Sequence, residues 1–140
     1  VVVPSLRAAR AEHGKALNVL GEMNSVPTVR EFLAAAAIRT TADYAVTADD
    51  ILGVDWTSSY DSTPGNAMGI HVPTLVLTMS CHYLVVPGEI IFDHLAAADK
   101  SYAAAEGATH GFTACDPVYG DTPKRIFDYV DAWVAGEGRF

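Results

Sequence analysis

Positive charge is scarce in this sequence, whose 140 residues include 9 Lys and Arg against 17 Asp and Glu, for a formal net charge of −8. No Lys or Arg lies between Arg39 and Lys100, whereas Asp and Glu recur through that stretch. A field of this sign repels the phosphates of nucleic acids and the surfaces of anionic membranes, so we expect neither as a partner. It also favours a neutral or cationic small-molecule substrate over an anionic one.

Long apolar runs and an initiating methionine are also missing. No run approaches the roughly 20 apolar residues that a membrane-spanning helix needs. The composition is nevertheless typical of a folded domain or part of one, because 50% of the residues are hydrophobic and 19% are charged. The chain begins at Val1, and residues 1–4 have neither the basic nor the apolar region of a signal peptide. We therefore expect a further segment to precede this chain, and the sequence does not distinguish a cytoplasmic from a secreted protein.

Cysteine is too rare for a disulfide-rich scaffold, since only Cys81 and Cys115 are present. Two interpretations stay open, one disulfide or two buried free thiols. His82 and His110 add imidazoles from which a metal site could be built with these thiols. No two of the four residues have the paired spacing of a zinc ribbon, and the adjacency of Cys81 and His82 suits a single ion poorly. We therefore expect no metal.

The first half of the chain predicts helices. Residues 5–20 have apolar residues at roughly helical spacing, and the Ala-rich run 29–38 is a strong helix former. A further short helix is predicted over 40–50. Residues 55–66 are polar turn material that carries two aromatic side chains, and such a segment is either a functional loop or a surface connection.

The second half has an α/β pattern. Residues 72–79 form a short, β-branched, apolar run typical of a buried strand in a parallel sheet. A helix is predicted over 87–95 and a second strand over 100–105. Asp121 and Pro123 are suited to begin a closing helix, which Gly136 ends, with apolar residues on one stripe (Ile126, Phe127, Val130, Trp133 and Val134). Strand, helix, strand and helix at this spacing predict an α/β unit.

His110 is the strongest candidate for chemistry. It lies directly past the predicted strand 100–105, within Gly-Ala-Thr-His-Gly-Phe. Ligands of open α/β sheets bind at the carboxyl ends of the strands. Gly107 and Gly111 would let the backbone turn tightly there. An imidazole can accept a proton near neutral pH, as a general base must. The alternative is a structural histidine that ends the strand.

The order of these elements over residues 70–135 resembles the carboxyl-terminal third of the α/β-hydrolase fold. The resemblance implies that residues 70–140 are a carboxyl-terminal core segment with the last two parallel strands and their flanking helices. Residues 1–69 would then be the helical cap, or lid, that this family inserts before its penultimate strand. The histidine after the last strand of that family is the catalytic base, which implies this role for His110.

The nucleophile of the family is missing from this sequence. It lies in a Gly-x-Ser-x-Gly elbow upstream of the acid and the histidine, and no such motif is present. Ser80 has no flanking glycines, and no strand precedes Ser25. The resemblance therefore implies that the nucleophile lies on an upstream amino-terminal segment or chain of the same precursor. This chain would be a proteolytic product or a processed subunit that pairs with it.

The α/β-hydrolase family places its catalytic acid just past the penultimate strand. In this sequence that place is occupied by His82 and Tyr83, neither of which is a carboxylic acid. Glu89 is the nearest carboxylate downstream and is our first candidate to orient the catalytic histidine. Alternatively, Glu89 serves only the first turn of its helix, where the helix dipole favours a negative charge. Asp55, Asp61 or an upstream residue could be the acid instead.

Residues from both halves of the chain are predicted to line the substrate site. Trp56 and Tyr60 would form apolar walls, as would Met68, if the first half is a lid, although each of them could simply pack the lid onto the sheet. His82 and Tyr83 would line the pocket at the carboxyl edge of the sheet.

The leading hypothesis is therefore a serine hydrolase that cleaves an ester, a lactone or an amide without a cofactor. One alternative keeps the fold and uses an aspartate nucleophile, as epoxide hydrolases and dehalogenases do. The other alternative is a non-catalytic binding module in which His110 is structural.

Overall fold

The computed structural model describes residues 28–31, 33, 37–47, 49–82 and 84–139. The helix predicted over 5–20 lies outside these residues, as does the predicted site residue Tyr83. Helix α2 (Val29–Glu31) agrees with the start of the helix predicted over 29–38. It begins with a reciprocal cap, because Thr28 Oγ1 accepts a hydrogen bond from the Glu31 amide and the Glu31 carboxylate accepts one from the Thr28 amide.

The helix predicted over 40–50 is wrong, because this segment belongs to a β-hairpin. Strand β1 (Arg39–Val46) pairs antiparallel with β2 (Ile51–Asp55). The turn is closed by Thr47, whose amide donates to the Asp50 carbonyl (2.8 Å) and whose hydroxyl accepts from the Asp50 amide (2.8 Å). The part of 1–69 predicted to be a helical cap therefore includes an antiparallel strand pair.

The polar segment 55–66 contains regular secondary structure. It contains a single 3₁₀ turn, η3 (Trp56–Ser58), and the start of the short helix α3 (Thr63–Ala67). Ser62 caps α3 by accepting a hydrogen bond from the Gly65 amide at 3.1 Å, and Pro64 occupies its first turn.

The α/β unit predicted for the second half is confirmed. Strands β3 (Thr74–Met79) and β4 (Lys100–Ala105) are parallel and pair without a break from Thr74↔Lys100 to Met79↔Ala105. Helix α4 (Val85–His94) connects them, and α5 (Thr122–Val134) follows β4. Asp121 caps α5 by accepting from the Lys124 amide at 2.9 Å, as its sequence predicts.

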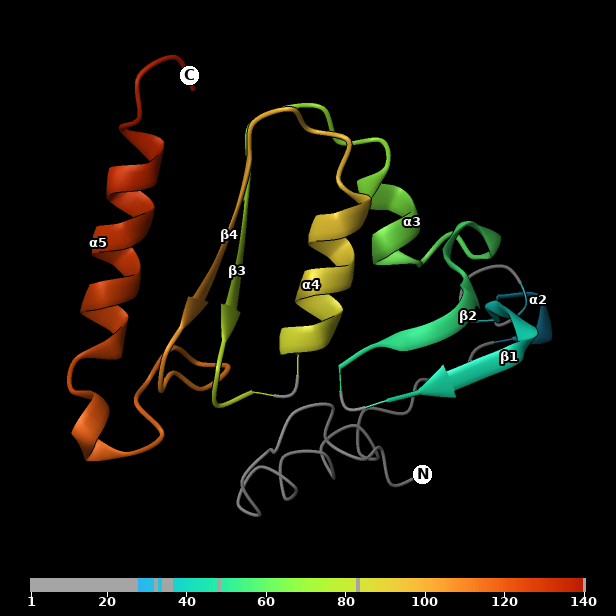
Figure 1. The fold of residues 1–140 in the computed structure, drawn as a ribbon, viewed down its shortest axis with the longest axis horizontal. Helices are drawn as coiled ribbons and strands as arrows, with labels where there is room; N and C mark the ends of the chain where they lie inside the picture. Colours follow the sequence, from blue (N-terminus) through green and yellow to red (C-terminus); the bar gives the residue numbers. More distant parts are fainter. Residues whose placement is uncertain (1–27, 32, 34–36, 48, 83, 140) are drawn as a thin grey trace.

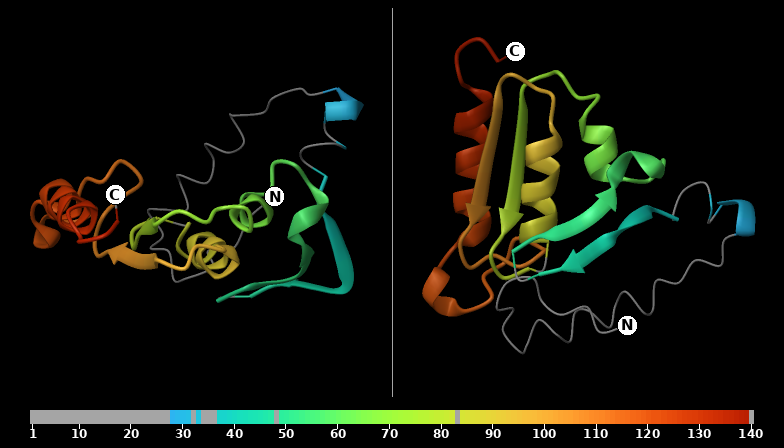
Figure 2. Two further views of the ribbon diagram at one scale, coloured as in Figure 1. Left: turned by 90° about the horizontal axis from the view of Figure 1, so that it is seen from above. Right: turned by 45° about the vertical axis from the view of Figure 1, so that its right-hand side comes forward.

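The two helices lie on opposite faces of this small sheet (Figures 1 and 2). On the α4 face, Phe92 meets Tyr102 of β4 edge-on, with ring centroids 5.7 Å apart. On the α5 face, the Trp133 indole donates to the Ser101 hydroxyl at 3.0 Å. Tyr102 and Ser101 are neighbours in β4, and side chains alternate between the faces of a strand. The sheet is therefore the middle of three layers.

The core lies between α4 and the hairpin. Val86 and Ile90 of α4 are buried, and Ile51 of β2 and Trp56 of η3 pack against them.

The apolar stripe predicted for α5 is only partly buried. Ile126 is 4% exposed, but Phe127 is 61% exposed. Among the described helices, none is long and apolar enough to cross a bilayer.

Candidate functional site

His110 lies in an exposed loop at the carboxyl end of the parallel sheet. We call residues 106–115, which directly follow β4, the histidine loop. The segment that follows β3 lies beside it, because the imidazole rings of His82 and His110 stack with centroids 4.6 Å apart and planes 27° apart. The prediction that His82 and His110 meet at this edge is confirmed.

Hydrogen bonds from the end of β3 hold the histidine loop. Ser80 Oγ accepts from the Gly107 amide at 2.8 Å, and the Cys81 amide donates to the Ala108 carbonyl at 3.0 Å. Within the loop, the Thr109 amide donates to the Thr113 carbonyl at 2.8 Å. The sequence did not predict this role of Ser80, which lacks the flanking glycines of a nucleophile elbow. Its place directly after a buried strand was the one signal for it.

A disulfide also joins the two segments. Cys81 and Cys115 are bonded, with Cα atoms 6.3 Å apart, so the first of the two open interpretations is the correct one. The Cys115 amide adds a 2.9 Å hydrogen bond to the Gly107 carbonyl. The backbone on both sides of His110 is therefore fixed to the end of β3.

Glycine is needed at one position of this loop. Gly107 has a φ of +76°, and a Cβ there would overlap the ring of Tyr119. Gly111 differs, since it has open space around it, and the positive φ beside it belongs to Phe112 (67°). Both glycines lie in the predicted tight turns, because the Ala108 amide donates to the Ala105 carbonyl at 3.2 Å and the Phe112 amide donates to the Thr109 carbonyl at 2.9 Å. Only the turn at Gly107 requires glycine.

We expect Gly107→Ala to destabilise the protein by roughly 1–3 kcal/mol, because a left-handed backbone strains alanine and the added methyl group displaces Tyr119. Gly111→Ala is the matched control and should leave stability within about 0.5 kcal/mol of the parent. Urea unfolding of the three proteins measures both effects. Equal midpoints for the two variants would contradict the assignment of Gly107.

A cavity of about 520 Å³ opens beside His110. Its walls come from the hairpin, η3, α3, β3 and α4, and His110 contributes to its lining. The lining residues are Ile51, Trp56, Thr63, Pro64, Val76, Leu77, Thr78, Met79, Leu84, Pro87, Gly88, Ile90, Ile91 and His110. None of these described residues is Asp, Glu, Lys or Arg, so the side chains of the walls are apolar apart from two hydroxyls, one indole N–H and one imidazole.

Not all of the predicted substrate-binding residues line this cavity. Trp56 lines it and also packs on the core. Tyr60 is 82% exposed and is not among the described lining residues, so its role in binding substrate stays a prediction. Sequence reasoning missed Ile51, because a helix was predicted over the segment that leads into β2. Only the pairing of the hairpin brings Ile51 to α4.

Glu89 lies on α4 and is half-buried. The helix begins at Val85, so Glu89 is its fifth residue and its first turn contains no acidic side chain. The alternative role that the sequence left for Glu89, in the first turn of the helix, is therefore wrong. Its role as the acid that orients His110 stays a prediction.

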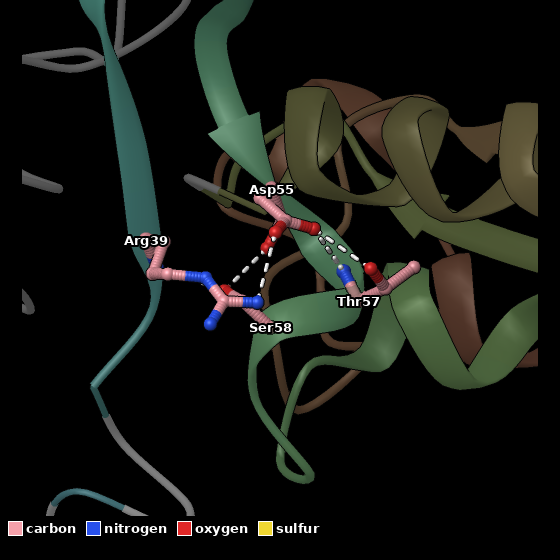
Figure 3. A network of polar contacts seen from close by, with 4 residues as sticks. All are labelled: Arg39, Asp55, Thr57 and Ser58. Carbon is pink, nitrogen blue, oxygen red and sulfur yellow. Dashed lines mark hydrogen bonds and ion pairs between the residues drawn. The ribbon is translucent and has the colours of Figure 1, made fainter.

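Asp55, one of the alternative acids, is engaged within the hairpin region (Figure 3). Its carboxylate accepts from the Thr57 hydroxyl at 2.7 Å and from the Arg39 guanidinium at 3.3 Å. The hydrogen bond from the Thr57 side chain, with a smaller contribution from Arg39, lowers the pKa of Asp55 below its ordinary value. This carboxylate is already used to hold η3 against β1.

Asp61, the other alternative, is exposed. Its backbone amide donates to the Ser59 hydroxyl at 3.3 Å. This contact involves the main chain and assigns no role to the Asp61 carboxylate.

No family model, curated protein or solved structure matches this chain. Among the described residues, no group of three or more His, Cys, Asp and Glu side chains is arranged to hold a metal ion.

Proposed function

We propose that this chain is the carboxyl-terminal part of an α/β-hydrolase-type serine hydrolase that cleaves an ester, a lactone or an amide. One observation carries the proposal. His110 is an accessible imidazole on a loop fixed at the carboxyl end of a parallel sheet, at the wall of an apolar cavity. A general base needs this combination of access and fixed position, and ligands of α/β sheets bind at this edge.

The chemistry assigned to His110 is proton transfer. Its imidazole accepts the proton of the serine hydroxyl as that oxygen attacks the carbonyl carbon. It then returns the proton to the leaving oxygen or nitrogen. Water repeats the sequence on the acyl-enzyme and regenerates the serine. The described arrangement supports this role because both flanks of His110 are fixed to β3, which limits the movement of the ring.

The serine is proposed to come from an upstream segment or chain of the same precursor. The sheet supports this arrangement, because among the described strands β3 pairs only with β4. The other edge of β3 can therefore accept a further strand, and unpaired strand edges favour such pairing. Helices on both faces of the sheet are also what an extended α/β sheet needs to cover its two sides.

A fluorophosphonate probe tests the reaction class, because it forms a covalent bond with an activated serine. We expect the complete gene product to be labelled on one serine outside these 140 residues. Intact mass and peptide sequencing locate the label, and the heat-denatured protein is the control for non-specific labelling. Hydrolysis of an ester without a labelled serine would overturn the serine assignment in favour of an aspartate nucleophile. Absence of both label and turnover would overturn the proposed function.

The acid is tested by Glu89→Gln. If Glu89 orients His110, this change should keep the fold and lower kcat by about 10⁴-fold, as loss of the triad carboxylate does in serine proteases. Asp55→Asn and Asp61→Asn are the comparison variants and should retain near-parental kcat. Steady-state kinetics with far-ultraviolet circular dichroism separate loss of chemistry from loss of structure. Near-parental kcat in all three variants would place the acid outside these residues.

A further inference from the structure

The cavity beside His110 has a composition that selects its ligand. We infer that it binds an uncharged, apolar acyl group of the substrate and holds the reacting carbonyl at the His110 end. This inference rests on the proposed hydrolase function and adds the substrate class. A volume of about 520 Å³ falls in the range of small-molecule sites, roughly 300–1,000 Å³. It is therefore large enough for more than an acetyl group.

The polar groups of the wall offer little to a polar ligand. The Thr78 hydroxyl already shares a 2.8 Å hydrogen bond with the Tyr102 hydroxyl. Thr63 is an exposed residue at the first position of α3. Of the other polar groups in the lining, the Thr63 hydroxyl, the Trp56 indole and the His110 imidazole, only the imidazole can accept a proton near neutral pH at the reacting end of a ligand. Burial of the hydrocarbon part of a ligand in this cavity therefore contributes most of the binding free energy.

Charge excludes an anionic ligand. No described lining residue is Lys or Arg, and the sequence from Thr40 to Asp99 contains neither. A carboxylate that entered the cavity would lose its hydration without a cation to replace it, which is costly. The net charge of −8 opposes its approach as well. A neutral ester or amide pays neither cost.

The walls are held by the core of the protein. Val86 and Ile90 form the buried cluster of α4, and Ile51 and Trp56 of the cavity wall pack on that cluster. On the sheet side, Gly88 lies so close to Thr78 that a side chain there would overlap it. The cavity is thus bounded by packed elements, and its size should set the length of acyl group that fits.

Ile91 provides the most direct test, because it lines the cavity from α4 and is only half-buried. We expect the parent enzyme to prefer p-nitrophenyl octanoate to p-nitrophenyl acetate in kcat/KM. Ile91→Trp fills part of the cavity and should lower the octanoate-to-acetate ratio by about tenfold or more, the scale on which apolar pockets discriminate chain length. A ratio between two substrates does not depend on the fraction of protein that is folded.

Two controls accompany this variant. Ile91→Leu keeps the volume and should leave the ratio within about threefold of the parent. Val134→Trp adds bulk at the exposed last residue of α5, which is not among the described lining residues, and should not change the ratio. An unchanged ratio in an active Ile91→Trp enzyme would overturn the inference and leave the hydrolase proposal intact.

A binding measurement tests the cavity without catalysis. The neutral fluorophore N-phenyl-1-naphthylamine should bind the full protein, and octanamide should displace it at concentrations at least about tenfold lower than octanoate does. Ile91→Trp should weaken the binding of the fluorophore, and Val134→Trp should not. This pattern in a protein without hydrolase activity would support the apolar ligand and refute only the proposed reaction. Equal displacement by octanoate and octanamide would overturn the inference about charge.

Discussion

Replacing His110 with Gln should lower kcat of the proposed hydrolase, measured with its upstream segment present, by about 10⁴- to 10⁶-fold. The reason is that a serine hydrolase without its base cannot remove the serine proton. Gln keeps a polar side chain of similar reach but cannot accept and return a proton in this way. Single-turnover kinetics with an activated ester measure the chemical step, and the folded fraction is checked by urea unfolding.

His71→Gln is the matched control for this prediction. His71 is also exposed, but it precedes β3 and therefore lies at the amino end of the strand, opposite His110. Its replacement should leave kcat within about twofold of the parent. A loss of less than about tenfold in the His110 variant would show that His110 is not the base. That result would favour the non-catalytic binding module.

Removal of the disulfide should have the largest effect on stability. Cys81 and Cys115 are separated by 34 residues, and closing a loop of this length lowers the entropy of the unfolded chain. The chain-entropy relation predicts a contribution of about 3–4 kcal/mol for such a loop. We therefore expect the Cys81→Ser/Cys115→Ser double variant to unfold at a lower urea concentration by a corresponding amount.

Reductant provides the control for the double variant. Dithiothreitol should lower the unfolding midpoint of the parent toward that of the double variant and should not affect the double variant itself. Turnover should also fall in the double variant, because the histidine loop would lose its covalent link to the end of β3. Hydrogen bonds to the Ser80 hydroxyl and from Cys81, Thr122 and Arg125 would still hold it. Coincident unfolding midpoints of parent and double variant would refute the stabilising role.

Local signals account for the elements that the sequence predicted well. The apolar run before Met79 needs burial on both sides, which a strand in a parallel sheet provides. The side chain of Asp121 accepts a hydrogen bond from the Lys124 amide in the first turn of α5, and Pro123 has no amide to leave unpaired. These are interactions within a few residues, so they can be predicted without knowing the rest of the fold.

The hairpin was missed because its decisive interaction is not local. Residues 40–46 become a strand through pairing with β2, for example Val46 with Ile51 and Arg39 with Asp55. The helix prediction for 40–50 was based on the residues of this segment alone and did not take its pairing partner β2 into account. The exposure of Phe127 has a similar origin, because a periodic pattern says which residues share a face of a helix but not how much of that face a small sheet covers.

The sequence by itself determined the α/β order of the second half and the position of His110 directly after its last strand. Only the tertiary structure decided that Cys81 and Cys115 form a disulfide, that His82 stacks on His110, and that Ile51 and Trp56 meet α4 at one cavity. The physical reason is distance along the chain. Parallel pairing brings the carboxyl ends of β3 and β4 together, and packing of the hairpin on α4 brings β2 to the same cavity, so residues tens of positions apart come into contact.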